Sequence, residues 1–147
     1  MSRVNISFPD PVLFTHDLRV RTYDINKGGH LGHDRLVSLL HEAREHFFFK
    51  LGFKELDIDG IGIVVADLMV QYLGEAFMAQ RLEIDMSISG VGRKSVDMYY
   101  RVKCIDNNEL VALAKTAIVF FDYGPRAAVE VPPVFLSRIK ERMGWAL

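Results

Sequence analysis

The sequence has a single cysteine, Cys104, no long uninterrupted apolar run and no excess of charge of either sign. One thiol excludes an internal disulfide framework and a multi-cysteine metal site, and it favours a reducing compartment. No segment approaches the ~18–20 apolar residues that span a bilayer, and the N-terminal stretch lacks the apolar core of a signal peptide. Eighteen basic and nineteen acidic side chains give a net charge of −1, which offers no general attraction for nucleic acid or anionic lipid. We therefore expect a cytoplasmic protein whose partners include no nucleic acid and no membrane.

What is present is an ordinary globular composition: 147 residues, of which 50% are hydrophobic and 25% charged. This excludes disordered and low-complexity classes, and the length is that of one domain. No internal repeat and no linker rich in proline, glycine or serine divides the chain. We expect one domain over residues 1–147.

Hydrophobic spacing predicts one long helix and several strands. Apolar residues at helical spacing follow Asp34, a plausible N-cap, and continue to Leu51, with Gly52 at the C′ position. Alternating or apolar segments predict strands over 17–23, 61–72, 82–88, 95–105 and 109–122. A short helix is expected after Pro133. The order indicates an α+β fold, an antiparallel sheet around one helix, with edge strands that favour a homodimer.

Polar groups gather between the first strand and the helix. The residues are Asp24, Asn26, His30, His33 and Asp34. Glycines allow backbone amides to approach a ligand there, and an imidazole at a helix N-terminus could activate water for attack on an acyl group. The same segment also fits a glycine-rich turn with ordinary capping residues. A metal held by His30, His33 and Asp34 is not expected, because no cysteine or third histidine is near.

The run RTYDINKGGHLGHDRLVSLLHEAR resembles a family motif. It is similar to the pattern D-x-D-x-x-G-H-V-N-N and the helix motif E-A-R of hotdog-fold acyl-CoA thioesterases, in particular the 4-hydroxybenzoyl-CoA thioesterase type. Gly29, His30 and Leu31 stand at the Gly-His-Val positions, and Glu42 to Arg44 at the helix motif. The resemblance implies a hotdog fold, a sheet wrapped around a central helix, and an active site at a dimer interface.

The resemblance assigns roles to individual residues in and beside this motif. His30 matches directly, and Asp24 matches the first Asp. The family's base or nucleophile is replaced by Asn26, which cannot take a proton but can orient water or a carbonyl. The positions of the two asparagines are Gly32 and His33, whose backbone N–H groups are expected to bind the thioester oxygen.

A further carboxylate is expected from the partner protomer. Glu75 resembles the position of a glutamate in plant acyl-carrier-protein thioesterases. Asp67 interrupts an apolar run and is expected to share a face with Val65 and Met69, where loss of water would raise its pKa toward the range of a general base. The competing interpretations are a hydrogen-bonding residue at an edge or interface for Asp67 and a solvated turn residue for Glu75.

The resemblance also suggests a place for coenzyme A. The turn at Arg93, Lys94 and Ser95 is expected to hold its phosphates, with Arg126 as a second candidate; an ordinary solvated turn is the competing interpretation. Phe47 to Phe49 could line an acyl pocket but fit helix core and interface packing better. His41 and His46 are expected to be packing or surface residues.

The leading functional hypothesis is a hydrolase of acyl-CoA or acyl-carrier-protein thioesters that needs no cofactor. The alternatives are a hotdog enoyl-CoA hydratase or dehydratase, whose D-x-N-P-x-H pattern Asp24, Asn26 and His30 resemble loosely, and a non-catalytic acyl-CoA binder, which Asn26 favours. The resemblance implies a homodimer, in a dimer of dimers.

Overall fold

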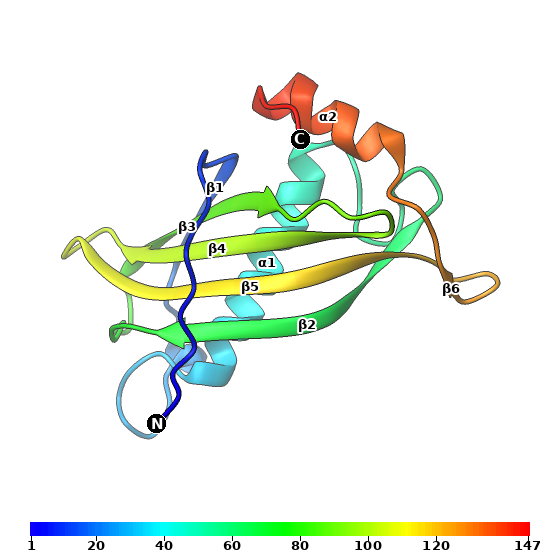
Figure 1. The fold of residues 1–147 in the computed structure, drawn as a ribbon. Coiled ribbons are helices and arrows are strands. Elements are labelled where there is room, and N and C mark those ends of the chain that lie inside the picture. Colours follow the sequence, from blue (N-terminus) through cyan, green and yellow to red (C-terminus); the bar gives the residue numbers. More distant parts are fainter.

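The strands form one antiparallel sheet that curves around helix α1 (His33–Lys50) in the computed structural model, which describes residues 1–147 (Figure 1). The strands are β1 (Phe14–Arg19), β2 (Gly62–Tyr72), β3 (Arg81–Ser89), β4 (Ser95–Cys104), β5 (Glu109–Asp122) and β6 (Ala127–Ala128). Their order is β1-β3-β4-β5-β2, and β6 pairs with β5. The α+β hotdog prediction is confirmed, and apart from β1 and the two-residue β6 each strand boundary lies within one residue of the one expected.

The core lies between α1 and the inner face of the sheet. Every second residue of β4 is buried, as the alternation predicted, and Cys104 is among them. The helix contributes its predicted apolar stripe, which includes Leu36, Leu40 and Phe47. The side chains of α1 and of the sheet interdigitate, and this packing stabilises the domain because it removes the apolar surface of both elements from water.

The first strand lies earlier than expected. β1 ends at Arg19, and Thr22–Asp24 forms a single 3-10 turn. The Asp24 carboxylate accepts a hydrogen bond from the Arg21 backbone N–H at 2.8 Å, so the chain turns where the alternating pattern predicted continued strand. The prediction of residues 17–23 was therefore wrong at both ends.

The N-cap of α1 is Gly32, and Asp34 lies within the first turn. The predicted Asp34 cap is corrected accordingly. A Cβ at Gly32 would lie 2.7 Å from Oδ1 of Asp34, so a larger residue there would require the Asp34 side chain to rotate away from the positive end of the helix dipole. At the other end Gly52 adopts φ +88° as predicted for a C′ glycine.

Strand β2 forms one edge of the sheet and contains a bulge. Val65 is opposite Ile118 of β5, but Asp67 is opposite Ala117, so Ala66 is the extra residue. The bulge reverses the alternation, and Asp67 faces the outer surface with Met69 while Val65 faces α1. The predicted common face of Asp67 and Val65 was wrong because alternation cannot reveal an inserted residue.

Two segments cover the sheet and helix. The N-terminal arm crosses the outer face of the sheet (Figure 1), where the Ser87 hydroxyl donates to the Pro11 carbonyl at 2.7 Å and the Ile6 N–H to Gln71 at 3.1 Å. Helix α2 (Pro133–Met143) packs Phe135 against the core. Neither α1 nor α2 has the length and apolarity needed to cross a membrane.

Candidate active site

Asp24 builds the loop before α1. Its side chain is buried, and its carboxylate accepts hydrogen bonds from the Arg21 backbone and guanidinium at 2.8 to 3.4 Å. Its carbonyl accepts the Gly32 N–H at 2.9 Å. These contacts fix the entry to the helix, and they give Asp24 a structural task independent of catalysis.

Asn26 and His30 close the same loop. The Asn26 side-chain oxygen accepts the Gly28 N–H at 2.9 Å, and the Asn26 N–H donates to the His30 carbonyl at 2.9 Å. His30 Nδ1 lies 3.0 Å from the Leu31 carbonyl. A carbonyl oxygen only accepts, so Nδ1 carries the proton and Nε2 of the neutral ring has a free lone pair. His30 is therefore an oriented base at the loop surface.

The two amides expected to bind a thioester oxygen differ. The Gly32 N–H donates to the Asp24 carbonyl at 2.9 Å, so in this conformation it is not free to bind a thioester oxygen. The His33 N–H makes no hydrogen bond, as is usual for the first residue of a helix. The α1 N-terminus thus presents the His33 amide as a donor for a developing negative charge.

The two predicted carboxylates lie in different places. Lys115 donates to the Asp67 carboxylate at 2.9 Å and the Ala117 N–H donates at 2.7 Å. The hydrogen bond from Lys115 keeps the pKa of Asp67 below its ordinary value, which corrects the predicted rise. Glu75 is exposed beside the His30 loop, because the Leu31 N–H donates to the carbonyl of Ala76 at 2.8 Å. The structure brings Glu75, and not Asp67, toward His30.

The turn expected to bind coenzyme A is exposed. Arg93 pairs with Glu130 at 3.0 Å, and both side chains are at least 70% accessible. Lys94 is exposed, and β4 begins at Ser95. The guanidinium of Arg126 lies instead over the rings of Phe121 and Tyr123, at 5.9 and 5.7 Å from their centroids.

A cleft of about 660 Å³ opens on the other half of α1, between the helix, the loop that follows it and the start of β2. Its apolar lining is Phe49, Phe53, Leu56, Ile63 and Val65, and its polar lining is His41, Arg44, Glu45, His46, Lys54 and Glu55. Phe49 is 75% exposed, whereas Phe47 and Phe48 lie in the core. The volume is that of a small-molecule pocket, and the mixed lining suits an apolar group joined to a polar reacting centre.

A polar chain leads from this cleft into the core. Glu55 accepts from Arg44 at 2.6 Å and lies 2.9 Å from His41 Nε2. Arg44 reaches the buried Tyr100 hydroxyl at 3.4 Å, and Tyr100 bonds Thr116 at 2.8 Å. Burial disfavours the charge of Arg44, but Tyr100 and Glu55 outweigh it and raise the pKa of Arg44.

No sequence pattern predicted that His41, Glu55 and Arg44 meet, although Arg44 belongs to the helix motif. His41 and His46 were expected to be packing or surface residues, and Glu55 lies fourteen residues beyond His41 in a loop. A histidine oriented by a carboxylate, which is itself held by a buried guanidinium, is an arrangement suited to general-base chemistry. Two groups could also supply metal ligands: His41 with Glu45 and Glu55, and His16 with Glu42 and His46.

Comparisons with known proteins address the family and the fold. A family model described as the thioesterase-like superfamily matches residues 20–139. The chain is similar to a 1,4-dihydroxy-2-naphthoyl-CoA thioesterase from Synechocystis, at 18% identity and a TM-score of 0.78, over 86% of this chain and 94% of that one. A DHNA-CoA thioesterase from Staphylococcus aureus matches at 19% identity and a TM-score of 0.77, over 86% and 88%.

A third solved structure, a gentisyl-coenzyme A thioesterase, matches at 21% identity and a TM-score of 0.74, over 83% of this chain and 98% of that one. No curated protein matches the sequence significantly. At these identities the solved structures establish the shared fold.

Proposed function

Because the chain belongs to the thioesterase-like superfamily, we propose that it hydrolyses an acyl-CoA or acyl-carrier-protein thioester to a free acid and a thiol. The observation that carries the proposal is the cleft beside α1, which joins an apolar lining to the His41–Glu55–Arg44 chain. An acyl or aryl group fits the apolar side, and the thioester carbon then lies near an oriented imidazole.

His41 acts as the base in this proposal. An ionised carboxylate only accepts hydrogen bonds, so the proton of neutral His41 is on Nε2 toward Glu55, and Nδ1 is free to take a proton from water. The water oxygen attacks the carbonyl carbon and its proton moves to Nδ1. The intermediate then collapses, the carbon–sulfur bond breaks, and the thiolate takes the proton back from the imidazolium.

The loop before α1 completes the site from a second protomer. Tyr72 at the end of β2 donates to the His33 carbonyl at 2.8 Å, whereas Ile63 and Val65 at its start line the cleft. Val65 and Tyr72 are opposite Ile118 and Ala112 of β5, which are six residues apart and therefore about 20 Å apart along the strand. His41 lies eight residues beyond His33 on α1, which is about 12 Å along the helix axis, so the loop that carries His30 and the imidazole of His41 lie at different ends of the candidate site in one chain.

Pairing of two β2 edges removes this separation. β2 has a free edge with the exposed apolar residues Val65, Leu68, Met69 and Tyr72. Antiparallel pairing across a two-fold axis sets the start of one strand beside the end of the other. The cleft of one protomer then faces the partner's His30, Glu75 and His33 amide. His30 serves as a second proton carrier, the His33 amide binds the carbonyl oxygen, and Asp24 and Asn26 hold the loop in shape.

The turn at Arg93 to Ser95 fits the carrier end of the substrate. Ser95 and Val64 are both opposite Val119 of β5, so this turn lies at the cleft end of the sheet, about 10 Å from β2. Phosphates of coenzyme A that leave the cleft along the sheet meet Arg93 and Lys94 there.

The test measures thiol release from a panel of aliphatic and aromatic acyl-CoAs. We expect turnover with at least one of them, and His41→Ala should lower kcat by about 10²–10⁴-fold with a smaller change in KM. Glu55→Gln should lower kcat less, and the matched change Glu83→Gln on the outer face should leave it unchanged.

Two other results would replace this proposal. Saturable binding of acyl-CoA without any thiol release would identify a non-catalytic binder, the function that Asn26 in place of the family carboxylate favours. Hydration of an enoyl-CoA without thiol release would identify a hydratase.

A further inference from the structure

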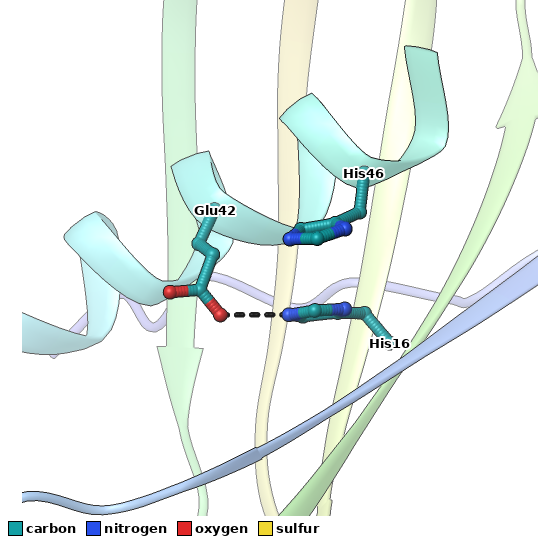
Figure 2. Close-up of side chains that lie close together, drawn as sticks. All are labelled: His16, Glu42 and His46. Atoms are coloured by element: carbon teal, nitrogen blue, oxygen red, sulfur yellow. Dashed lines mark hydrogen bonds and ion pairs between the residues drawn. The ribbon is translucent and has the colours of Figure 1, made fainter. Parts of the chain in front are cut away.

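Three metal-ligating side chains meet on the side of α1 that faces β1. His16 comes from the edge strand β1, and Glu42 and His46 come from successive turns of the helix (Figure 2). His16 Nε2 lies 2.7 Å from Glu42 Oε2, and the rings of His16 and His46 stack with centroids 4.2 Å apart. One ligand atom of each residue lies within 4.8 Å of the others.

We propose that His16, Glu42 and His46 form a binding site for a divalent transition-metal ion of the zinc type. Two imidazoles and one carboxylate are a ligand set that Zn²⁺ takes, with the fourth position open. Glu42 and His46 are four residues apart and therefore lie on one helix face. The site is formed within one chain and does not rest on the proposed hydrolysis, although His46 also lines the cleft.

The spacing of the three side chains suits a metal ion. Ligand atoms around a tetrahedral Zn²⁺ with bonds of about 2.0–2.1 Å lie roughly 3.3 Å apart. His16 Nε2 and Glu42 Oε2 are 2.7 Å apart, and the ligand atoms of all three residues lie within 4.8 Å of one another, so small side-chain rotations reach this spacing. The His16 side chain is 14% exposed and held by the strand, whereas Glu42 is 41% exposed and His46 is at the surface. The more exposed side chains of Glu42 and His46 can therefore rotate toward an ion that is bound by the less exposed His16.

The second group of metal-ligating side chains, His41, Glu45 and Glu55, differs from this cluster because a cationic side chain already pairs with one of its carboxylates. In the group of His41, Glu45 and Glu55, the guanidinium of Arg44 already lies 2.6 Å from Glu55 and competes with a bound cation. Neither lysine nor arginine pairs with Glu42, whose hydrogen bond is with His16 alone. The His16–Glu42–His46 cluster therefore leaves its carboxylate available to a metal.

A bound ion would join β1 to α1. His16 pairs opposite Ile84 and so faces the helix, and an ion that cross-links this edge strand to the helix stabilises only the folded state. At a free metal concentration of about 100 Kd, we expect the Tm to rise by about 5–10 °C.

The experiment titrates Zn²⁺ and Co²⁺ into the full-length protein after removal of metal with a chelator. We expect one ion per chain, a Co²⁺ visible absorption typical of low coordination number, and the rise in Tm. His46→Ala, a surface change, should weaken Zn²⁺ binding at least tenfold, and Glu42→Gln should weaken it as well. His41→Ala and Glu45→Gln, which alter the neighbouring cluster, should bind like the parent protein.

Three results would overturn the site. One is the absence of saturable binding at one ion per chain, which would mean that the hydrogen-bonded and stacked side chains only pack. The second is unchanged affinity in both His46→Ala and Glu42→Gln. The third is a loss confined to His41→Ala and Glu45→Gln, which would move the ion to the cleft. Unfolding curves in chelator check that each variant is folded before binding is compared.

Discussion

The ion pairs of this protein differ in solvent exposure, and the exposure of each pair determines how much it contributes to stability. Asp67 meets Lys115 where its side chain is 48% exposed, so the pair is screened by water and adds little stability. Glu55 meets Arg44 with both side chains at most 13% exposed. The sequence predicted which polar residues build the loop before α1, because they are neighbours in the chain. It could not predict the His41–Glu55 pair, because that contact depends on how a loop folds back.

Asp85 is a nearly buried carboxylate in an ion pair, and we expect it to make the stability of the protein depend on pH. Its side chain is 5% exposed, beneath the N-terminal arm, and lies 2.9 Å from Arg101 and 3.1 Å from Lys103. Burial acts to raise the pKa of Asp85, but hydrogen bonds from Thr15, Lys103 and Arg101 outweigh it and hold the pKa below its ordinary value. The ionised form is therefore favoured by folding, and its contribution to stability is lost as the pH falls below about 3.9.

We expect Asp85→Asn to lower the free energy of unfolding at pH 7 by about 1–3 kcal/mol. The deficit should shrink as the pH falls from the unfolded pKa of about 3.9 through the lower pKa of Asp85 in the folded protein, because the parent protein also loses this charge there. Urea unfolding at both pH values measures the effect, and Asp17→Asn, an exposed change on the adjacent β1, is the control. An equal deficit at both pH values would show that the lost contacts, and not the charge, are responsible.

At the scale of elements, hydrophobic periodicity predicted the helix and strands that bury one face, but it did not predict the bounds of β1 or the bulge in β2. The apolar stripe of α1 and the alternation of β3, β4 and β5 follow directly from burial on one face. The end of β1 depends instead on the contact between Arg21 and Asp24, which turns the chain. The bulge in β2 depends on the register with β5, where Val65 and Asp67 are opposite consecutive residues. The bulge matters for function because it turns Asp67 away from α1.

The β2 edge predicts the effect of a charge on assembly. Leu68 lies near the middle of the strand and is 43% exposed, so two copies approach each other when β2 pairs with β2. Leu68→Lys places two like charges together, and we expect the dimer to dissociate. Sedimentation or light scattering measures the mass. Val91→Lys, 40% exposed in the β3–β4 turn, should remain dimeric. A Leu68→Lys variant with the same mass as the parent would exclude this edge as the interface.

At the scale of the whole molecule, the resemblance read from the sequence is confirmed by the family match over residues 20–139, and the predicted hotdog fold by the solved structures. The candidate site was predicted only in its loop half. Of the cleft residues, only Arg44 belongs to the family motif, whereas His41, Glu55 and the apolar lining come from positions of α1, a loop and β2 that no motif marks. In the proposed dimer, a second copy brings the loop half of the candidate site to the cleft.

Sharing of the site between protomers predicts complementation. His30→Ala and His41→Ala each remove one proposed side of every site in a homodimer, so both variants should have low kcat. In a mixed dimer one site carries both changes and the other carries neither. After denaturation and refolding of an equal mixture, random pairing should restore about a quarter of the parent activity per chain. Acyl-CoA hydrolysis measured before and after subunit exchange tests this. Recovery requires two residues from different chains at one site, whereas a mixture no more active than its components would place both histidines in the same protomer's site.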